Sequence, residues 1–187
     1  VMARSALTGH LVFSTLHTNT ALAIITRLLD IGLSKTLLCD PHFLCCLVCQ
    51  RLISKLCPEC AVSISDMAYD HPHIVYWQRV FGSQFQHLHV RHEHGCKHCH
   101  GTGISARTVV AEVVWVDEAG RRFIREEDLV GWEKHLRSNG WQSYYDKAIK
   151  LVASGLVDPA DAEKAVGEIR AVHQHEHFQY HEYNDLS

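Results

Sequence analysis

The stretch GCKHCHGTG, Gly95–Gly103, decides how the middle of this chain folds. It holds the pair Cys96 and Cys99, and a second pair, Cys57 and Cys60, stands upstream in CPEC. Zinc takes four ligands in a tetrahedron, and two thiolates three residues apart can occupy one of its edges. Two such pairs predict a zinc site. Because four protein ligands leave no position for water, the site is expected to be structural and not catalytic.

The segment between the two pairs, residues 61–95, has few long apolar periods, and metal binding would offset its weak core. Two alternatives stay open. The four cysteines could be reduced and hold no metal, or a histidine could replace a cysteine or bind a second ion. Four histidines stand beside the second pair: His92, His94, His98 and His100.

The other four cysteines indicate core positions. We expect a second helix from about Pro41 to Leu56, and Cys45, Cys46 and Cys49 lie on it among apolar residues. On a buried helix a cysteine usually acts as a small hydrophobic side chain. We expect the same of Cys39.

The composition limits the class of protein. The chain has 187 residues, of which 47% are hydrophobic, and its net charge is -3, so it can bury a core and carries no basic footprint for nucleic acid. No apolar run reaches the length of a membrane span. The opening, VMARSALTGH, lacks the apolar region and cleavage site of a secretory signal. Eight cysteines in such a chain favour a reducing compartment and metal ligation over disulfides.

The first part of the chain reads as a strand followed by a helix. Leu11–Leu16 is short, apolar and partly β-branched, which predicts a buried strand. Thr18, Asn19 or Thr20 can cap the next helix, in which Leu22, Ile25, Leu28 and Leu29 share one face before Gly32 ends it.

The last part of the chain reads as a strand followed by helices. Thr108–Val116 is predicted to be a strand. Helices are expected at Asp128–Ser138, at Trp141–Ser154, which Gly155 ends, and after Asp158, an N-cap with Pro159 in the first turn. Residues 171–187 are rich in histidine and predict an exposed, mobile tail, which could also chelate metal weakly.

Two histidines, His10 and His17, flank the predicted strand. The strand would end in Ser-Thr-x-His-Thr, so Thr15, His17 and Thr18 would stand at its carboxyl end, where ligands bind in α/β sheets. The alternative is that both histidines are ordinary surface residues.

Several blocks follow one another in a specific order: ALTGHLVFSTLHTN, RLLDIG, QRLISKLCPEC, GCKHCHGTG and ART. In this order they resemble the C-terminal part of the ATPases that power type II secretion and type IV pilus assembly. The resemblance runs from about Ala3 to Asp117 and continues more loosely to about Ile169.

The resemblance implies an α/β fold: the C-terminal part of a RecA-like P-loop ATPase domain, with a four-cysteine zinc subdomain and a mostly helical C-terminal region. The implied domains are the late ATPase core (1–56), the zinc subdomain with its histidine-rich insert (57–107), a strand with C-terminal helices (108–170) and the tail (171–187). The family works as a hexamer on the cytoplasmic face of the inner membrane, peripheral to it and docked to pilus or secretion platform proteins.

The resemblance also implies roles for single residues. His10 and His17 match the family's histidine box near the nucleotide phosphates, with Thr15 and Thr18 beside them. Arg107 matches the arginine after the second cysteine pair, and Gln50 and Arg51 match the Gln-Arg-Leu block. The four paired cysteines match the family's zinc ligands.

The sequence departs from the family in places. Thr102–Arg107 reads TGISAR in place of Thr-Gly-Tyr-x-Gly-Arg, and Thr20 stands where an acidic residue is usual. No Gly-x-x-x-x-Gly-Lys-Ser/Thr loop occurs, and that loop cradles the phosphates. We therefore expect the chain to be the back part of a longer protein, with ATP and Mg²⁺ bound only together with an upstream half, and to be inactive alone.

Three other functions compete with the motor. The first is a zinc-stapled protein-interaction module without catalysis, which the lack of a P-loop favours. The second is a DnaJ-type chaperone, whose zinc domain repeats Cys-x-x-Cys-x-Gly-x-Gly four times. This chain has one such repeat, so Gly101 and Gly103 are better explained by a tight turn from the knuckle into the strand. The third, a nucleic-acid-binding zinc ribbon, disagrees with the acidic balance.

Overall fold

The computed structural model describes residues 2–67 and 73–170. It mixes helices and strands as the sequence predicts, and the chain divides into two compact units. The first unit contains the residues up to Gln50 together with Ala111–Tyr144, and the second contains Arg51–Val110 together with the residues from Tyr145 onward. The histidine-rich tail, 171–187, lies outside the described residues.

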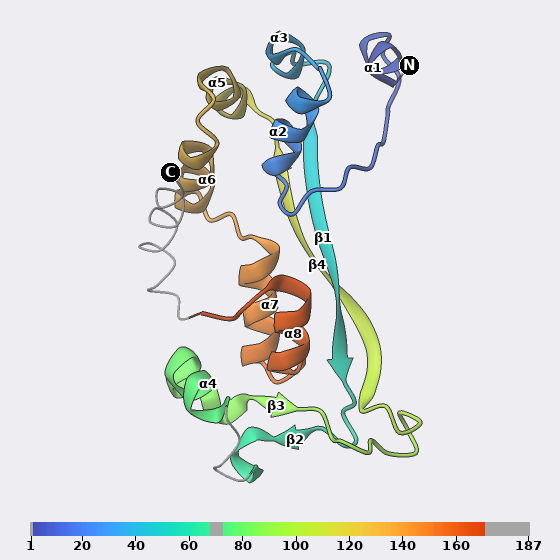
Figure 1. Cartoon of the computed structure of the whole chain (residues 1–187), viewed down its shortest axis with the longest axis vertical. Helices are drawn as coiled ribbons and strands as arrows, with labels where there is room; N and C mark the ends of the chain where they lie inside the picture. The colour runs from blue at the N-terminus through green and yellow to red at the C-terminus, as the bar shows by residue number, and fades with distance from the viewer. Residues whose placement is uncertain (1, 68–72, 171–187) are drawn as a thin grey trace, which may run out of the picture. The chain divides into compact units, whose positions relative to one another are not determined.

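The helices and strands follow one another as labelled in Figure 1. Before the second cysteine pair they are α1 (Met2–Leu7), α2 (Ala23–Asp30), α3 (Lys35–Leu38), β1 (Cys46–Leu56), β2 (Val62–Ser63), the 3-10 helix η1 (Ile64–Asp66), α4 (Ile74–Phe81), the 3-10 helix η2 (Gly82–His87) and β3 (His89–Val90). After it come β4 (Ile104–Trp115), α5 (Glu118–Glu126), α6 (Leu129–Ser138), α7 (Tyr144–Ala153) and α8 (Pro159–Val166).

The first unit has its own apolar core. Side chains from α2 and the two residues before it, and from β1, β4, α5 and α6, meet there, among them Ala21, Leu22, Ile25, Leu47, Cys49, Val114, Ile124 and Trp132. The expected helix after the histidines is confirmed: Ile25 is buried, and Leu28 and Leu29 pack against the core. Leu22, and none of the three expected residues, stands at the N-cap of α2 and makes no side-chain capping bond, but Thr20 Oγ1 does accept a hydrogen bond from Ala23 N at 3.1 Å.

The strands β1 and β4 form a two-stranded sheet. Val116 N donates to Cys45 O at one end of the pair, and Cys57 N donates to Gly103 O at the other. The chain therefore advances along one strand while it returns along the other, and the pair is antiparallel. The predicted strand Thr108–Val116 is confirmed and begins earlier, at Ile104.

The expected helix Pro41–Leu56 is wrong, because Cys46–Leu56 is the strand β1. Leu47 and Cys49 are buried while Val48 and Gln50 are exposed, which is the two-residue period of a strand. Periodicity does not distinguish a short apolar run in a strand from one in a helix. The core assignment of the cysteines holds for Cys49 and fails for the exposed Cys45, while Cys39 and Cys46 are half-buried.

The expected buried strand Leu11–Leu16 is also wrong in this structure. These residues are not assigned to a strand, and Leu11 and Phe13 expose 79% and 86% of their surface. A strand needs a neighbour for its backbone N–H and C=O groups. The described residues provide no ladder for this segment.

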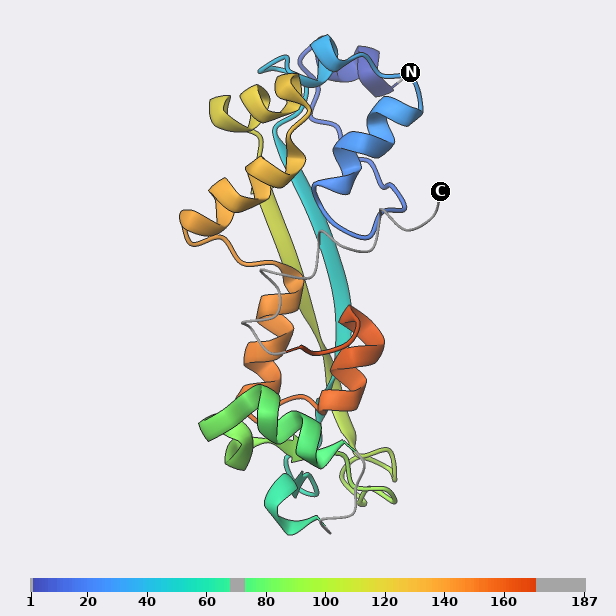
Figure 2. The ribbon, with the colours of Figure 1, turned by 60° about the vertical axis from the view of Figure 1, so that its left-hand side comes forward.

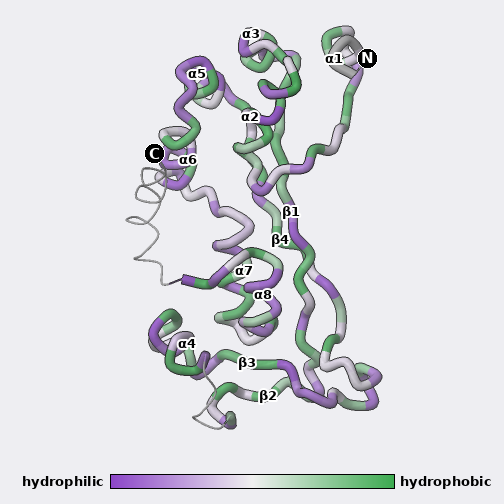
Figure 3. The backbone as a smooth tube through the Cα atoms, in the orientation of Figure 1, coloured by the Kyte–Doolittle hydropathy of each residue, from purple (hydrophilic) through white to green (hydrophobic). Residues whose placement is uncertain are grey.

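The second unit contains both cysteine pairs. β2 and β3 pair antiparallel, with Val62 opposite Val90 and Ser63 opposite His89. In Figure 3 the tube is hydrophobic at β3 and becomes hydrophilic in the segment that leads to the second cysteine pair. Figures 1 and 2 both show α7 beside α8 in this unit.

The C-terminal helices largely match the expected ones. Asp128 and Asp158 cap α6 and α8 with their side chains, and Pro159 opens α8. Helix α5 was not predicted as a separate element, and neither was α4 in the insert. Among residues 2–67 and 73–170, none of the helices combines the length and the apolar character that crossing a membrane requires.

Candidate metal centre and histidine segment

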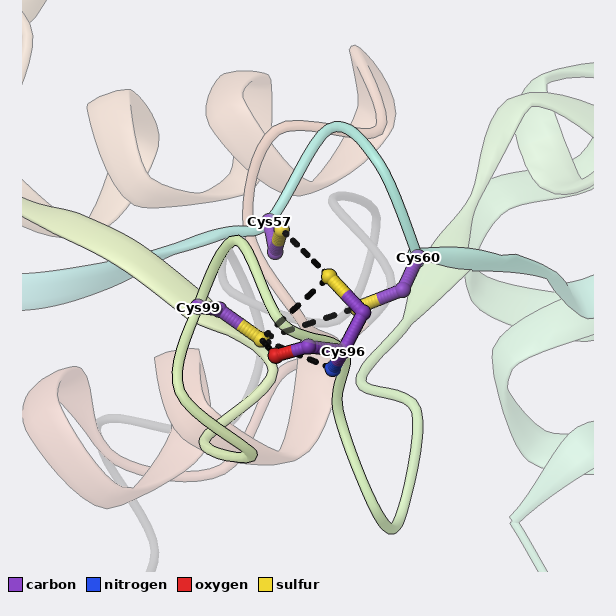
Figure 4. A group of neighbouring side chains, drawn as sticks. All are labelled: Cys57, Cys60, Cys96 and Cys99. Carbon is purple, nitrogen blue, oxygen red and sulfur yellow. Dashed lines mark hydrogen bonds between the residues drawn. The ribbon is translucent and has the colours of Figure 1, made fainter.

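Two loops of the second unit bring the four predicted metal ligands together. Cys57 and Cys60 follow the end of β1, and Cys96 and Cys99 lie in the loop between β3 and β4. Figure 4 shows their sulfur atoms turned toward one another. All four sulfurs lie within 4.8 Å of one another, and within the described part of the chain no other group of His, Cys, Asp or Glu has this geometry.

The sulfur separations fit a tetrahedral metal. Cys57 and Cys96 are 3.9 Å apart, and Cys60 and Cys96 each lie 3.8 Å from Cys99. A tetrahedron with Zn–S bonds of 2.3 Å has S···S edges of about 3.8 Å, whereas a disulfide needs about 2.05 Å. The observed spacing is that of a four-thiolate metal site. No histidine belongs to the cluster, which disfavours a mixed ligand set.

Backbone groups favour the thiolate form of one ligand. The N–H groups of Cys96 and Gly103 each donate to Cys99 Sγ at 3.1 Å. The bond from Cys96, and secondarily that from Gly103, lowers the pKa of Cys99 to about 6, against burial, which raises it. Burial raises the pKa of Cys57, and burial with the neighbouring thiols raises that of Cys60 to about 12. A bound metal would displace the protons that these thiols keep.

The two glycines after the second pair form the predicted turn. Gly101 and Gly103 have φ of +79° and +68°, values that favour glycine. A Cβ on Gly103 would also lie 2.4 Å from Arg91 Cγ. The close turn lets Gly103 N reach Cys99 Sγ before β4 begins. Gly101 and Gly103 therefore serve a tight turn into the strand, as the sequence indicates, and are not explained as part of a DnaJ-type chaperone repeat.

Residues 8–19, which carry His10 and His17 and are called the histidine segment from here on, lie in the first unit. His10 is exposed, with its Nδ1 3.1 Å from Thr8 Oγ1, and it helps to line an open hollow of ≈ 460 Å³ with His42. His17 and Thr15 are exposed, and Thr18 is half-buried. Arg107 is exposed on β4 in the second unit.

Two buried side chains hold the end of the histidine segment: Cys49, an expected core position, and Glu112, which the sequence did not single out. Cys49 of β1 donates its S–H to Asn19 O at 3.4 Å. Glu112 of β4, only 2% exposed, accepts from Ala21 N at 2.5 Å and from Tyr144 N at 3.4 Å. A buried carboxylate is costly unless it is hydrogen-bonded. A charged residue inside the apolar run TVVAEVVWV was the available signal for Glu112.

Comparisons with known proteins agree with the resemblance that the sequence blocks from ALTGHLVFSTLHTN to ART indicate. The family model described as "Type II/IV secretion system protein" matches residues 1–174. The chain is 31% identical to the type II secretion system ATPase E of Vibrio cholerae serotype O1 over 170 residues, which cover 90% of this chain and 32% of that protein.

Two further relatives match 66% and 88% of this chain. The type II secretion system protein E of Aeromonas hydrophila is 37% identical over 125 residues, 66% of this chain and 23% of that protein. The protein transport protein HofB homolog of Escherichia coli K12 is 29% identical over 171 residues, 88% of this chain and 33% of that protein. The chain thus spans between 23% and 33% of the length of these relatives. With a family model that matches nearly its whole length, the chain belongs to the type II/IV secretion system protein family.

Proposed function

We propose that this chain forms part of a hexameric ATPase that powers type II secretion or type IV pilus assembly through ATP-driven domain motion. The observation that carries the proposal is the similarity to the type II secretion system ATPase E of Vibrio cholerae along 90% of the chain. In this proposal the chain supplies the C-terminal part of a RecA-like domain. ATP and Mg²⁺ would bind together with a P-loop, which this sequence does not contain.

The proposed nucleotide site uses the exposed histidine segment. His17 and His10 would stand near the phosphates, where an imidazole can sense the terminal phosphate and couple hydrolysis to domain movement. Thr15 and Thr18 would add hydroxyl groups. Arg107, which lies in the other unit, is proposed separately as a phosphate-binding residue, because a guanidinium pairs well with phosphate oxygens. The exposure of both histidines leaves their rings accessible to such a ligand.

The proposed metal is one structural zinc ion held by Cys57, Cys60, Cys96 and Cys99. The sulfur spacing supports this assignment, because it equals the edge of a zinc–thiolate tetrahedron. With four protein ligands the ion would stabilise the fold of the second unit and take no part in chemistry. The zinc unit would then present a rigid surface to a neighbouring subunit or to a platform protein at the cytoplasmic face of the inner membrane.

The test is a Mg²⁺-dependent ATPase assay on the native polypeptide that contains this sequence. We expect hydrolysis by the wild type and a drop in kcat of roughly 10²- to 10³-fold in His17→Ala, the loss typical of a group that stabilises transition-state charge. His94→Ala is the matched control, because His94 is equally exposed and lies in the other unit. Its activity should equal that of the wild type.

Two outcomes would contradict the motor. If the native polypeptide begins near Met2, or if it hydrolyses no ATP, the chain is better described as a zinc-stapled interaction module. If the wild type is active and His17→Ala is unimpaired, the assignment of the histidine segment fails while the motor stands. Intact-mass measurement of the native protein separates these cases first.

A further inference from the structure

The turn between α7 and α8, residues 155–158, contacts the chain on both sides of the cysteine cluster. We call the segment of chain that leads into each cysteine pair an arm: the end of β1 leads to Cys57 and Cys60, and β3 leads to Cys96 and Cys99. The first contact of the turn is to the arm of Cys57 and Cys60. Leu156 O accepts a hydrogen bond from Leu56 N at 2.9 Å, directly before Cys57. Leu56 O accepts from Ser105 Oγ at 2.9 Å, so the same residue is also bonded to β4. The first cysteine pair therefore starts from a residue that the turn holds.

The second contact is to the arm that carries Cys96 and Cys99. Asp158 is 8% exposed, and its Oδ2 accepts from Arg91 N at 2.7 Å. Arg91 Nη1 also lies 3.7 Å from Asp161 Oδ2 in the first turn of α8. Arg91 in turn lies against Gly103, whose N–H donates to Cys99 Sγ. The turn thus reaches the ligand Cys99 through two intervening residues, Arg91 and Gly103.

A third contact brings the turn against β3, which leads into the same arm. Gly155 has φ +72°, and a Cβ there would lie 2.6 Å from His89 Nδ1 and 2.7 Å from His87 O. The backbone of the turn therefore approaches the arm as closely as a residue without a side chain allows. Three separate contacts, all within the second unit, connect one turn to both halves of the cysteine cluster.

We propose that this turn is a supporting part of the metal site, so that zinc binding and the docking of α7 and α8 stabilise each other. The inference rests on the proposed zinc site. Each cysteine pair lies at the end of its own arm, and the metal is the link between the pairs at the ligand end. The turn links the arms at the other end. Holding both arms reduces the conformational entropy that the ligands lose when they bind the metal. Asp158 is then a positioning residue, since it touches no ligand itself.

The Asp158→Asn variant tests this role selectively. Asp158 Oδ1 caps α8 by accepting from Ala160 N at 2.8 Å, while Oδ2 holds Arg91 N. An asparagine has one acceptor oxygen in place of two. The cap offers this oxygen two N–H groups, those of Ala160 and Asp161, whereas the arm offers one, so the oxygen is expected at the cap and the NH2 group then faces the Arg91 N–H and removes that link. We expect zinc affinity, measured by competition with a chromophoric chelator, to fall on the order of ten-fold, as for outer-shell partners of metal ligands.

Asp128→Asn is the matched control. Asp128 caps α6 through Oδ1, which accepts from Gly131 N at 2.7 Å, and it lies in the first unit. Its zinc affinity should equal that of the wild type. Equal affinities of the wild type and Asp158→Asn would overturn the inference. If the wild type binds no zinc at all, the zinc site itself is refuted, which is a different result.

The reciprocal effect needs no variant. Hydrogen exchange of the wild-type chain, with zinc and after chelation, should show faster exchange in α7 and α8 once zinc is removed, and unchanged exchange in α5 and α6. Unchanged exchange in α7 and α8 would contradict the coupling even if Asp158→Asn fails to fold. As an independent variant, Gly155→Ala should also weaken zinc binding, because its Cβ would push against His89.

Discussion

At the scale of single residues, Glu112 shows how one buried carboxylate organises the first unit. It lies on β4 and accepts hydrogen bonds from Ala21, before α2, and from Tyr144, at the start of α7. The N-termini of helices favour negative charge. A carboxylate between two such groups satisfies them both and holds the end of the histidine segment against the sheet.

Two replacements of Glu112 should distinguish the contribution of its charge to stability from the contribution of its hydrogen bonds. Glu112→Ala leaves the buried N–H of Ala21 and the half-buried N–H of Tyr144 without this acceptor and should cost about 2–4 kcal/mol of unfolding free energy. Glu112→Gln retains one acceptor oxygen and should cost about half as much. Urea denaturation of the two variants measures both values. The argument fails if Glu112→Ala is as stable as the wild type.

At the scale of elements, α5 and α6 show how close two helices approach when one offers a glycine. Gly120 of α5 is buried, and a Cβ there would lie 2.5 Å from Cζ2 of Trp132, a fully buried side chain of α6. Asp117 and Asp128 cap the two helices with their carboxylates. The contact between Gly120 and Trp132 fixes the spacing of this helix pair.

The glycine contact predicts the sign of a substitution. Helix propensity alone would make Gly120→Ala stabilising by about 1 kcal/mol. Because Trp132 would have to move in a filled core, we expect the variant to be destabilised by about 1–3 kcal/mol instead. The control is Glu126→Ala on the exposed side of α5, which should change stability by less than about 0.5 kcal/mol. Thermal unfolding followed by circular dichroism decides between the two signs.

At the scale of the whole molecule, two compact units divide the work that we propose. The first contains the histidine segment and an apolar core of its own. The second contains the four cysteines and the turn that contacts both of their arms. Metal binding should therefore affect the two units unequally.

Zinc removal is the measurement that checks this division. Mass spectrometry should find one zinc ion per chain, lost in Cys99→Ser and retained in Cys45→Ser, whose thiol is exposed outside the cluster. Zinc at a hundred-fold excess over its Kd adds about 2.7 kcal/mol of stability. Chelation should thus lower the Tm of the second unit by about 10–20 °C. An identical shift of both units in calorimetry, or no bound zinc, would refute the division.

The sequence by itself determined the cysteine cluster, the cap Asp158, the glycine turn before β4 and the family. These features depend on the spacing of a few residues along the chain, and ligand geometry and backbone sterics act over the same short range. Only the tertiary structure decided that Cys46–Leu56 is a strand and that Leu11 and Phe13 are exposed, since an apolar run adopts the form that its neighbours permit. The roles of Glu112 and of the turn at Asp158 also depended on it. Their partners stand 91 and 67 residues away, and which distant groups meet is settled by the packing of whole elements.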